Sequence, residues 1–490
     1  MSQIVEKSKS YDSAGHRPGQ TPRGNRLAKA SLLWMVLTAL AIRLIVMVFL
    51  LPEQLDPSRD HWHFGYETGR IARSIVQGRG FSSPLFAETG PTAWMSPIYP
   101  YIVAGVFKVF GIYTTASAVV LLSLNALTSA LTCIPIFFIA RRTFGERAAK
   151  WSGWGWAFFP YAVYFPVERI WETWLATLLL TLLFLFALHL GDPFADAPSD
   201  DDPTEDDRSK DDQPEARPAW RNWIAFGLLA GLAALTSPAI VSVLPCLGGW
   251  ICYRLHRRRQ AWILPSVVSA LAFILFVSPW FIRNYETFHR FIPFRDNMGM
   301  VLRLGTKGAT NHWAAYDLGP WHSDAEWQQF QQLGELGYMA KEKKQALEFI
   351  RANPGWYAWT TLRRAVFIWT GFWSFDRAYL AEEPLDPPNI FLCTAFTVLA
   401  LLGLWRAFRS NPAAAVLYAL VLVTFPAIYY ITSPEVYYRR PIDPLIVILA
   451  ASLVPARWGA QKRGVQKRGM QKQSPLPSGS VTANSRSPQV

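Results

Sequence analysis

The residues that could do chemistry lie in three short polar stretches of this 490-residue chain. The stretches read Asp60-His-Trp-His-Phe-Gly-Tyr-Glu67, Glu168-Arg-Ile-Trp-Glu172 and Glu435-Val-Tyr-Tyr-Arg-Arg-Pro-Ile-Asp443. A carboxylate can take a proton from a reacting group, and two arginines beside tyrosines can clamp a phosphate. Each stretch therefore has a chemical interpretation, and each also has a purely structural one.

The first stretch leads into a predicted amphipathic helix that ends at Gly78 and Gly80. Its apolar residues are Phe64, Ile71, Ile75 and Val76, and they alternate at helical spacing with Arg70, Arg73 and Gln77. We expect this helix to lie in the membrane surface, with Glu67 in its first turn. From the residues alone, Glu67 is either a functional carboxylate or one that complements the helix dipole and pairs with Arg70.

Two histidines in the same stretch, His61 and His63, lie close to Asp60. A metal site is conceivable because imidazole and carboxylate are standard zinc ligands. The His-x-His spacing is weak, however, and interfacial polar residues are the favoured interpretation. We therefore assign no residue to a metal.

The second and third stretches each leave two interpretations open. Glu168 can pair with Arg169, whereas Glu172 lies one helical turn further on, where an ionisable residue at the end of a membrane span usually faces a cavity. Arg439 and Arg440 fit either a phosphate clamp or an aromatic and basic belt at the membrane interface.

The composition is that of a membrane protein. Hydrophobic residues make up 51% of the chain and charged residues only 17%, against about 25% charged in an ordinary soluble domain. The apolar residues collect into long runs, several of which reach the roughly 17 residues needed to cross a bilayer. The runs are Ser31–Leu51, Pro97–Gly111, Ile112–Ala140, Trp151–Phe165, Ile170–Leu190, Trp223–Leu235, Ala239–Tyr253, Trp262–Ile282, Ile390–Phe408, Ala413–Ile431 and Ile442–Val454. Their repetition predicts an all-α polytopic membrane protein, in which Arg43 faces protein rather than lipid.

The charged residues are distributed unevenly along the chain, whose formal charge is +13. Basic clusters at Arg23–Lys29, Arg141–Lys150, Arg254–Arg259 and Lys462–Lys472 adjoin apolar runs. The positive-inside rule places such clusters at the cytoplasmic ends of spans, so we expect no nucleic-acid partner. The four cysteines lie in or beside apolar runs and indicate neither a disulfide nor a metal site.

The clusters define the predicted domains. We expect a disordered cytoplasmic tail over residues 1–30, a transmembrane domain over 31–455 and a disordered basic cytoplasmic tail over 456–490. Within the transmembrane domain, residues 191–218 form a disordered acidic cytoplasmic insert, and the outside loops cover 52–96, 283–389 and 433–441.

One inconsistency remains in this topology. An odd number of crossings must separate the outside residue Ser96 from the inside residue Arg141, yet the sequence between them contains two apolar runs. Either Pro97–Gly111 is an incomplete or re-entrant span, or one cluster is misassigned. The tryptophan-rich Ala365–Phe375 is too short to cross and is interpreted as interfacial.

Five stretches, in order, resemble the membrane-embedded, lipid-dependent glycosyltransferases of the GT-C superfamily. They are Tyr66–Phe81, Pro97–Tyr101, Trp171–Glu172, Pro279–Asn284 and Tyr437–Pro441. The closest branch is glycosyltransferase family 39 with its bacterial relatives, which includes protein O-mannosyltransferases and the aminoarabinose transferases of lipid A. The resemblance runs from about Ser31 to Val454. It implies a GT-C-type transmembrane helical bundle with periplasmic loops and a juxtamembrane amphipathic helix.

The resemblance also implies roles for individual residues. The family's catalytic base lies in the first outside loop, where Glu67 is the nearest match; Asp60 is the alternative, because the family's Asp-Glu pair is not present. A second family acid matches Glu172. The Arg-Tyr-Arg-like stretch before the last span matches three residues expected to bind the donor phosphate, namely Tyr438, Arg439 and Arg440. The residues expected to shape the acceptor side are Arg283, Asn284 and Arg295.

The implied activity is transfer of a hexosyl or pentosyl group, by a mannosyltransferase-like reaction, from a polyprenyl-phosphate-linked donor to a glycolipid, glycan or protein. The reaction would invert the anomeric carbon, use a carboxylate base and take place at the periplasmic face of a bacterial inner membrane. A monophosphate donor does not require a metal to bridge two phosphates, so no cofactor is assigned, although a divalent metal is compatible with the reaction.

Two other functions fit the composition. One is a transporter or flippase for a lipid-linked or anionic solute, which usually shows internal repeats that we do not find between the two halves of this sequence. The other is a non-catalytic membrane scaffold that acts through its charged tails. The large polar outside loops favour the enzyme over both.

Overall fold

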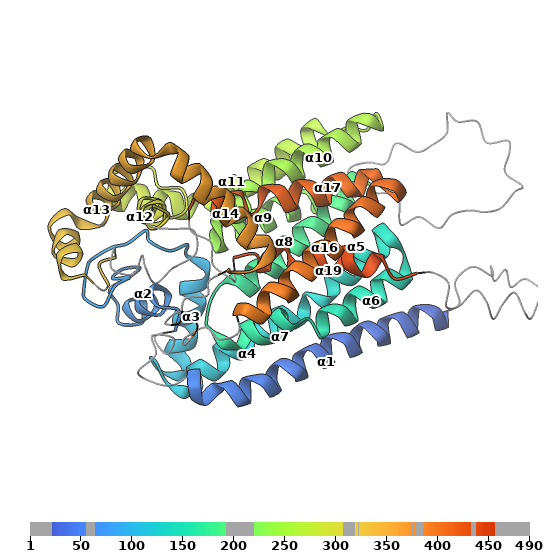
Figure 1. The fold of residues 1–490 in the computed structure, drawn as a ribbon, viewed down its shortest axis with the longest axis horizontal. Coiled ribbons are helices and arrows are strands. Elements are labelled where there is room, and N and C mark those ends of the chain that lie inside the picture. Colours follow the sequence, from blue (N-terminus) through green and yellow to red (C-terminus); the bar gives the residue numbers. More distant parts are fainter. Residues whose placement is uncertain are drawn as a thin grey trace, which may run out of the picture.

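The computed structural model describes residues 22–54, 64–192, 220–306, 319–321, 323–373, 377, 380, 386–432 and 438–455. This part of the chain is helical, apart from connecting segments and one isolated β-bridge between Ser82 and Pro91. Long helices run along the molecule, and four others gather at one end, at the left of Figure 1. These four are α2 (Glu67–Val76), α3 (Ile98–Phe110), α12 (Met298–Leu304) and α13 (Asp324–Ala352). We call this end the loop end.

Seven helical segments of the described chain are long and apolar enough to cross a membrane. They are Ser31–Pro52, Thr115–Phe144, Thr173–Gly191, Pro238–Arg257, Ile263–Phe288, Pro387–Ser410 and Pro412–Ile431. They belong to α1 (Pro22–Gln54), α4 (Thr115–Leu131) with α5 (Cys133–Phe144), α8 (Thr173–Gly191), η2 (Pro238–Ser242) with α10 (Leu244–Arg257), α11 (Ile263–Phe288), α16 (Asp386–Ser410), and α17 (Pro412–Thr424) with α18 (Ala427–Ile431). The prediction of an all-α, multi-pass membrane fold is therefore confirmed.

The helices of residues 97–140 bear on the inconsistency in the predicted topology. The apolar helix α3 has only 13 residues and packs against α2 at the loop end. In contrast, α4 and α5 form one span of 30 residues, Thr115–Phe144, with Thr132 in the helical conformation between them. By length, only Thr115–Phe144 can cross a membrane between Ser96 and Arg141, which agrees with the interpretation of Pro97–Gly111 as an incomplete span.

A buried arginine stabilises the break between two short helices. The apolar run 151–165 forms two helices, α6 (Glu146–Ala157) and α7 (Pro160–Glu168), because the ring of Pro160 cannot continue the first one. The carbonyls at the end of α6 lose their helical partners. Arg43 of α1 donates to two of them, Trp156 O and Ala157 O, each at 3.2 Å. Arg43 is completely buried, so it faces protein as predicted.

Close packing of the remaining helices relies on small residues. Helix α9 (Trp220–Thr236) lies against α11, and a Cβ at Gly227 would come within 2.1 Å of Ser269 O. One at Gly231 would lie 2.9 Å from the ring of Phe276. Small residues four apart let two helix backbones approach closely in a membrane. The apolar helix α19 (Asp443–Ser452) packs against α16 and α6 in the same bundle.

The loop end has an apolar core of its own, built from α2, the segment 81–95, α9, α11, α12 and α13. Ile71 of α2 is completely buried in it. The predicted amphipathic helix is therefore present, but its apolar face packs on protein instead of on lipid. The reason is that α3 and the segment 81–95 supply apolar side chains that cover it, which periodicity within α2 could not reveal.

The opposite end carries basic residues around the C-terminus of α8. Asp192 accepts from Arg254 Nη2 at 3.3 Å and from Arg258 Nη1 at 2.5 Å, and Arg142 donates to its backbone carbonyl. Residues from two predicted cytoplasmic clusters thus meet at one end, which we call the basic end (Figure 1). The predicted insert follows directly, and most of it (residues 193–218) lies outside the described residues.

Candidate active site at the loop end

A strained turn brings the first and second polar stretches together. Phe64, Gly65 and Tyr66 all have positive φ, at 60°, 79° and 52°, which is costly for the two residues that carry a Cβ. A Cβ at Gly65 would lie 2.4 Å from Ile170 O. The rings of Tyr66 and Trp171 meet edge to face, with 6.1 Å between their centroids. Helix α2 then begins at Glu67, next to the segment that ends at Glu172.

Glu172 is the N-cap residue of α8, and its side chain is buried, with 9% exposed. Within the described part of the chain, its Oε2 receives no hydrogen bond. Burial raises the pKa of Glu172 to about 7, and the charge of Glu67 adds to this effect, whereas Arg295 opposes it. The structure thus places two predicted site residues, Glu67 and Arg295, within electrostatic reach of Glu172.

The neighbouring Glu168 has a different environment. Its carboxylate accepts two hydrogen bonds from Arg169, at 2.6 Å and 2.9 Å. The backbone carbonyl of Arg169 accepts from Asn125 Nδ2 at 3.2 Å, and Asn125 accepts from the Tyr99 hydroxyl at 2.9 Å. The structural interpretation of Glu168 is therefore confirmed, and Glu172 is the acid of this stretch that remains available.

Aromatic residues from the end of the chain border the same site. Tyr429 of α18 interacts electrostatically with Arg295 and Glu172. The ring of Tyr438 stacks on that of Tyr429 with centroids 4.6 Å apart. Tyr438 was predicted from the sequence, but Tyr429 was not, because it lies inside an apolar run. Its signal is the paired Tyr429-Tyr430 at the end of that run.

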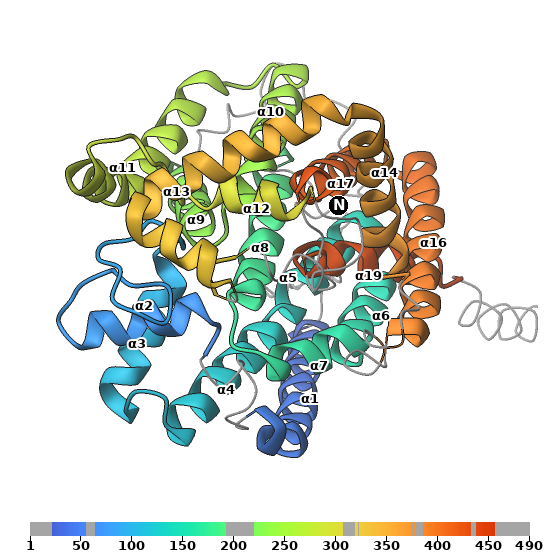
Figure 2. The ribbon, with the colours of Figure 1, turned by 60° about the vertical axis from the view of Figure 1, so that its left-hand side comes forward.

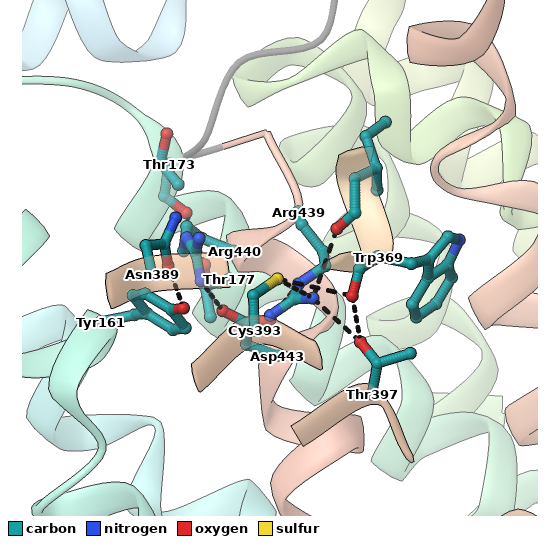
Figure 3. Close-up of polar contacts among 11 residues, drawn as sticks. Tyr161, Thr173, Thr177, Trp369, Asn389, Cys393, Thr397, Arg439, Arg440 and Asp443 are labelled. Carbon is teal, nitrogen blue, oxygen red and sulfur yellow. Dashed lines mark hydrogen bonds and ion pairs between the residues drawn. The ribbon is translucent and has the colours of Figure 1, made fainter. Parts of the chain in front are cut away.

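The predicted arginine pair lies deeper in the protein. Arg439, Arg440 and Asp443 are all at least 98% buried. Asp443 Oδ1 accepts from Arg439 Nε at 2.9 Å, and Oδ2 accepts from Arg440 Nη1 at 2.6 Å (Figure 3). An interfacial belt would leave these side chains exposed to headgroups, so that interpretation does not fit. One aspartate faces two guanidinium groups, which leaves this arginine cluster (Arg439, Arg440 and Asp443) with an excess positive charge.

One guanidinium nitrogen of the cluster stays open. Arg439 Nη1 lies 2.9 Å from Cys393 Sγ and 3.3 Å from both Ile368 O and Thr397 Oγ1. Within the described part of the chain, the buried Nη2 of Arg439 has no hydrogen-bond partner. Arg440 lies 3.7 Å from the ring centroid of Tyr161, a cation–π contact.

A small pocket opens onto these arginines between α14 (Pro354–Thr370) and α16, which lie side by side in Figure 2. It is lined by Phe367, Ile368, Gly371, Phe372, Asn389, Cys393, Arg439 and Arg440. The sequence did not indicate Cys393 or Tyr161, since no spacing rule joins residues so far apart. Asp443 closes the third polar stretch, but the sequence assigned it no role. The predicted interfacial segment Ala365–Phe375 begins in the last turns of α14 and so borders the pocket.

Glu172 and the arginine cluster both lie beside the beginning of α8. The short 3-10 helix η4 (Arg440–Ile442) packs against the beginning of α8, where Figure 3 shows Thr173 and Thr177 beside Arg440. Thr177 is five residues beyond Glu172, which corresponds to roughly 8 Å along a helix axis. The arginine cluster is thus about one and a half helical turns from Glu172.

The three predicted acceptor-side residues do not share one role. Arg283 donates to Thr92 O at 2.7 Å, Phe81 O at 2.8 Å and Asn284 Oδ1 at 2.9 Å. The buried Asn284 donates to Ile292 O at 2.8 Å. These two residues tie segments of the loop end to α11, whereas Arg295 reaches Glu172.

Two further predictions concern Asp60 as a possible base and the absence of a metal site. Asp60, His61 and His63 lie outside the described residues, so the choice between Asp60 and Glu67 is not tested. Among the described residues, no group of three or more His, Cys, Asp or Glu side chains could hold a metal ion.

Comparison with known proteins supports the fold. Neither a family model nor a curated protein matches the sequence. The archaeal oligosaccharyltransferase AglB from Archaeoglobus fulgidus, in complex with an inhibitory peptide and a dolichol-phosphate, matches with a TM-score of 0.51 at 14% identity. The match covers 94% of this chain and 53% of AglB, so the chain spans about half the length of that protein. ArnT from Cupriavidus metallidurans in the apo state matches with a TM-score of 0.42 at 16% identity, over 87% of this chain and 62% of ArnT. The likeness to AglB shows the GT-C-type fold that the sequence resemblance predicted.

Proposed function

We propose that this protein is a membrane glycosyltransferase that moves a sugar from a polyprenyl-phosphate-linked donor to an acceptor hydroxyl at the loop end. The observation that carries the proposal is the convergence of Glu67, Glu172 and a buried arginine pair on the beginning of α8. AglB, whose fold this chain shares, was solved with a dolichol-phosphate.

The pocket between α14 and α16 suits the phosphate of the donor. The open Nη2 of Arg439 and the excess positive charge of the arginine cluster favour an anion there. Both helices also carry exposed apolar side chains, including Leu362 at 55% and Phe391 at 78%, on which a prenyl tail can pack. At such a low-dielectric boundary, fixed guanidinium groups stabilise the charge that develops on a departing phosphate. Tyr438 lies next to the arginines along the chain and would close the donor side.

The acids suit the acceptor. An acceptor hydroxyl needs a base, and Glu67 would take its proton while the new bond to the anomeric carbon forms and the bond to the phosphate oxygen breaks. A single displacement of this kind inverts the anomeric carbon. Asp60 is the alternative base. Glu172, Arg295 and Tyr429 would orient the acceptor, and the strained turn at Phe64–Tyr66 fits a site whose geometry is imposed by its surroundings.

The finer identity of the reaction follows from the sequence resemblance. We infer transfer of a hexosyl or pentosyl group, of the mannosyltransferase-like kind, to a glycolipid, glycan or protein. The location would be a bacterial inner membrane, with the loop end on the periplasmic side.

The test is a transfer assay with purified full-length protein in nanodiscs and a panel of synthetic polyprenyl-phosphate sugars. We expect a covalent sugar product, and we expect Glu67→Gln to lower its rate by about 10²-fold or more, which is the usual contribution of a general base. Glu88→Gln is the matched control, because Glu88 lies in the same outside segment, is 70% exposed and pairs with Arg79. Full turnover by both Glu67→Gln and Asp60→Asn would show that the base is assigned wrongly.

A transporter would give a different result in the same preparation. Reconstituted into liposomes, it would move the lipid-linked solute across the bilayer without forming any new glycosidic bond. That outcome would replace the proposed function.

A further inference from the structure

A second pair of acids lies buried beside the candidate active site. Asp296 directly follows Arg295, and Glu335 is the first residue after a kink of α13 at Gly334, where φ is 65°. Glu335 is 9% exposed, and both carboxylate oxygens of Asp296 are shielded from solvent. The proposed reaction uses neither residue, so the burial of two acids needs another explanation.

Both acids hold the same short piece of the first outside segment. Glu335 Oε1 accepts from the Ala93 N–H at 2.7 Å, and Oε2 accepts from the Thr92 hydroxyl at 2.5 Å. The backbone N–H of Asp296 donates to Ala93 O at 3.0 Å. Residues 92–93 are therefore held by α13 on one side and by the Arg295–Asp296 segment on the other.

The two carboxyl groups also interact electrostatically with each other. Within the described part of the chain, the oxygens of Asp296 receive no hydrogen bond from an N–H group or a hydroxyl. The side chain that interacts with them is Glu335. Two carboxyl groups can form a hydrogen bond only when one of them carries a proton.

The surroundings favour that proton. Burial and the neighbouring Asp296 raise the pKa of Glu335 to about 8, and burial raises the pKa of Asp296 to about 6. The charged group that faces the pair from α11 is Arg283, which in turn faces Tyr101 of α3. Arg283 already donates to Thr92 O and Phe81 O, so its charge is shared with those carbonyls.

We propose that Asp296 and Glu335 share one proton, and that the protonated pair latches α12 and α13 onto residues 92–93 and so keeps Arg295 beside Glu172. Asp296 and Glu335 are thus positioning residues. Their effect on sugar transfer rests on the proposed function, whereas their effect on the packing of the loop end does not.

The sign of the pH dependence follows from proton uptake. When the latch opens, both carboxyls return toward their ordinary pKa values of 3.8 and 4.5. Between these values and about 8, the closed latch binds more protons than the open one. The closed state is therefore favoured most below about pH 4.5 and loses stability as pH rises, until the loss levels off above about pH 8.

Hydrogen exchange of the full-length protein tests the latch directly. After correction for chemical exchange, we expect amides of residues 92–96 and 298–304 to exchange at least about tenfold faster at pH 8.5 than at pH 6, since one pKa unit corresponds to a factor of ten. In Glu335→Gln, which keeps a neutral hydrogen-bonding side chain, this difference should disappear. Asp296→Asn removes the neighbouring charge but not the burial of Glu335, so it should reduce the difference, and it provides a second test if the first variant does not fold. Glu348→Gln on α13, which alters an exposed ion pair with Lys344, should keep the wild-type pH difference.

The rate of sugar transfer provides a second readout. We expect a decline of the wild-type rate toward pH 8 that is absent in Glu335→Gln. Exchange that does not depend on pH in the wild type, or a difference that persists undiminished in Glu335→Gln and Asp296→Asn, would overturn the latch. If hydrogen exchange shows that the latch opens but the rate of sugar transfer does not change, the latch exists and only its positioning role is overturned. If no donor supports transfer, the proposed function fails while the exchange result still decides whether the latch exists.

Discussion

At the scale of residues, burial decides which acid can do chemistry. Glu168 and Glu172 are four positions apart, and the sequence favoured Glu172 because Glu168 has an arginine directly beside it. The structure gives Glu168 a bidentate arginine and leaves one oxygen of Glu172 buried without a hydrogen bond from the described residues. A group whose ionised form is disfavoured by its surroundings is a candidate for a functional site, because folding alone would not select it.

Glu172→Gln tests this argument through stability. The pKa of Glu172 rises from 4.5 to about 7 in the folded protein, so its contribution to stability falls as pH rises between these values. The variant has no such group. Between pH 5 and pH 8, we expect the free energy of unfolding of the variant to rise relative to that of the wild type by up to about 3 kcal/mol. This change is measured as a difference in melting temperature that increases with pH. We also expect the variant to transfer sugar more slowly than the wild type.

Glu168→Gln is the matched control for this measurement. It breaks the pair with Arg169, so it should destabilise the protein without reproducing the gain at high pH. A Glu172→Gln variant whose stability relative to the wild type is the same at pH 5 and pH 8 would contradict the raised pKa.

The residue types of the site were largely accessible from the sequence, and their partners were not. Glu67, Glu172, Arg439 and Arg440 stand out because ionisable side chains are rare next to long apolar runs. Arg439, however, contacts Cys393, which is 46 positions away and looks like any other small residue in an apolar helix. Only the packing of α16 against α19 brings the two together.

At the scale of elements, apolar runs predicted the long helices, and tertiary contacts decided where they break or continue. The continuous apolar run Ile112–Ala140 already indicates that α4 and α5 form one span, and Pro160 indicates the break before α7. The stability of that break depends on Arg43, which comes from a helix more than a hundred residues earlier in the chain. Periodicity likewise predicted α2 but not the protein surface that covers it.

The junction between α14 and α16 offers a test of the donor pocket. Gly371 ends α14 with φ 88° and ψ 170°, and a Cβ there would lie 3.2 Å from Ile390 Cα at the beginning of α16. Gly371→Ala should therefore displace the wall of the pocket in addition to straining the backbone. We expect the KM for the polyprenyl-phosphate donor to rise several-fold, with a loss of stability of about 1–3 kcal/mol from the strained conformation.

Gly145→Ala separates the two effects. Gly145 has nearly the same conformation, with φ 90° and ψ 175°, but no atom lies within 4 Å of a Cβ built there. The control should show a similar drop in melting temperature with an unchanged donor KM. Equal KM values for the two variants would show that the α14–α16 junction does not shape the donor site.

At the scale of the whole molecule, the two ends differ in chemistry. The loop end combines the acids, the strained turn and the latch, and the basic end gathers arginines around the C-terminus of α8. The sequence predicted this division, because the positive-inside rule depends only on which loops carry Lys and Arg. It could not predict that the outside segments fold onto each other around a shared apolar core, since that core joins residues from six separate parts of the chain.

Single-cysteine labelling of intact cells tests which end faces outward. The background lacks the four native cysteines, and cysteines replace three exposed residues, Glu88, Lys344 and Lys150, with side-chain exposures of 70%, 78% and 52%. Glu88 and Lys344 belong to the two loop-end segments that the latch joins, and Lys150 lies near the basic end. A membrane-impermeant maleimide should label Glu88→Cys and Lys344→Cys directly and Lys150→Cys only after permeabilisation, because the basic end is retained in the cytoplasm.

Two other results would contradict this orientation. If only Lys150→Cys is labelled in intact cells, the orientation is the reverse, and the proposed reaction takes place at the cytoplasmic face. Labelling of Glu88→Cys and Lys344→Cys from opposite sides would separate the acids from the rest of the site, and no common reaction centre could then exist.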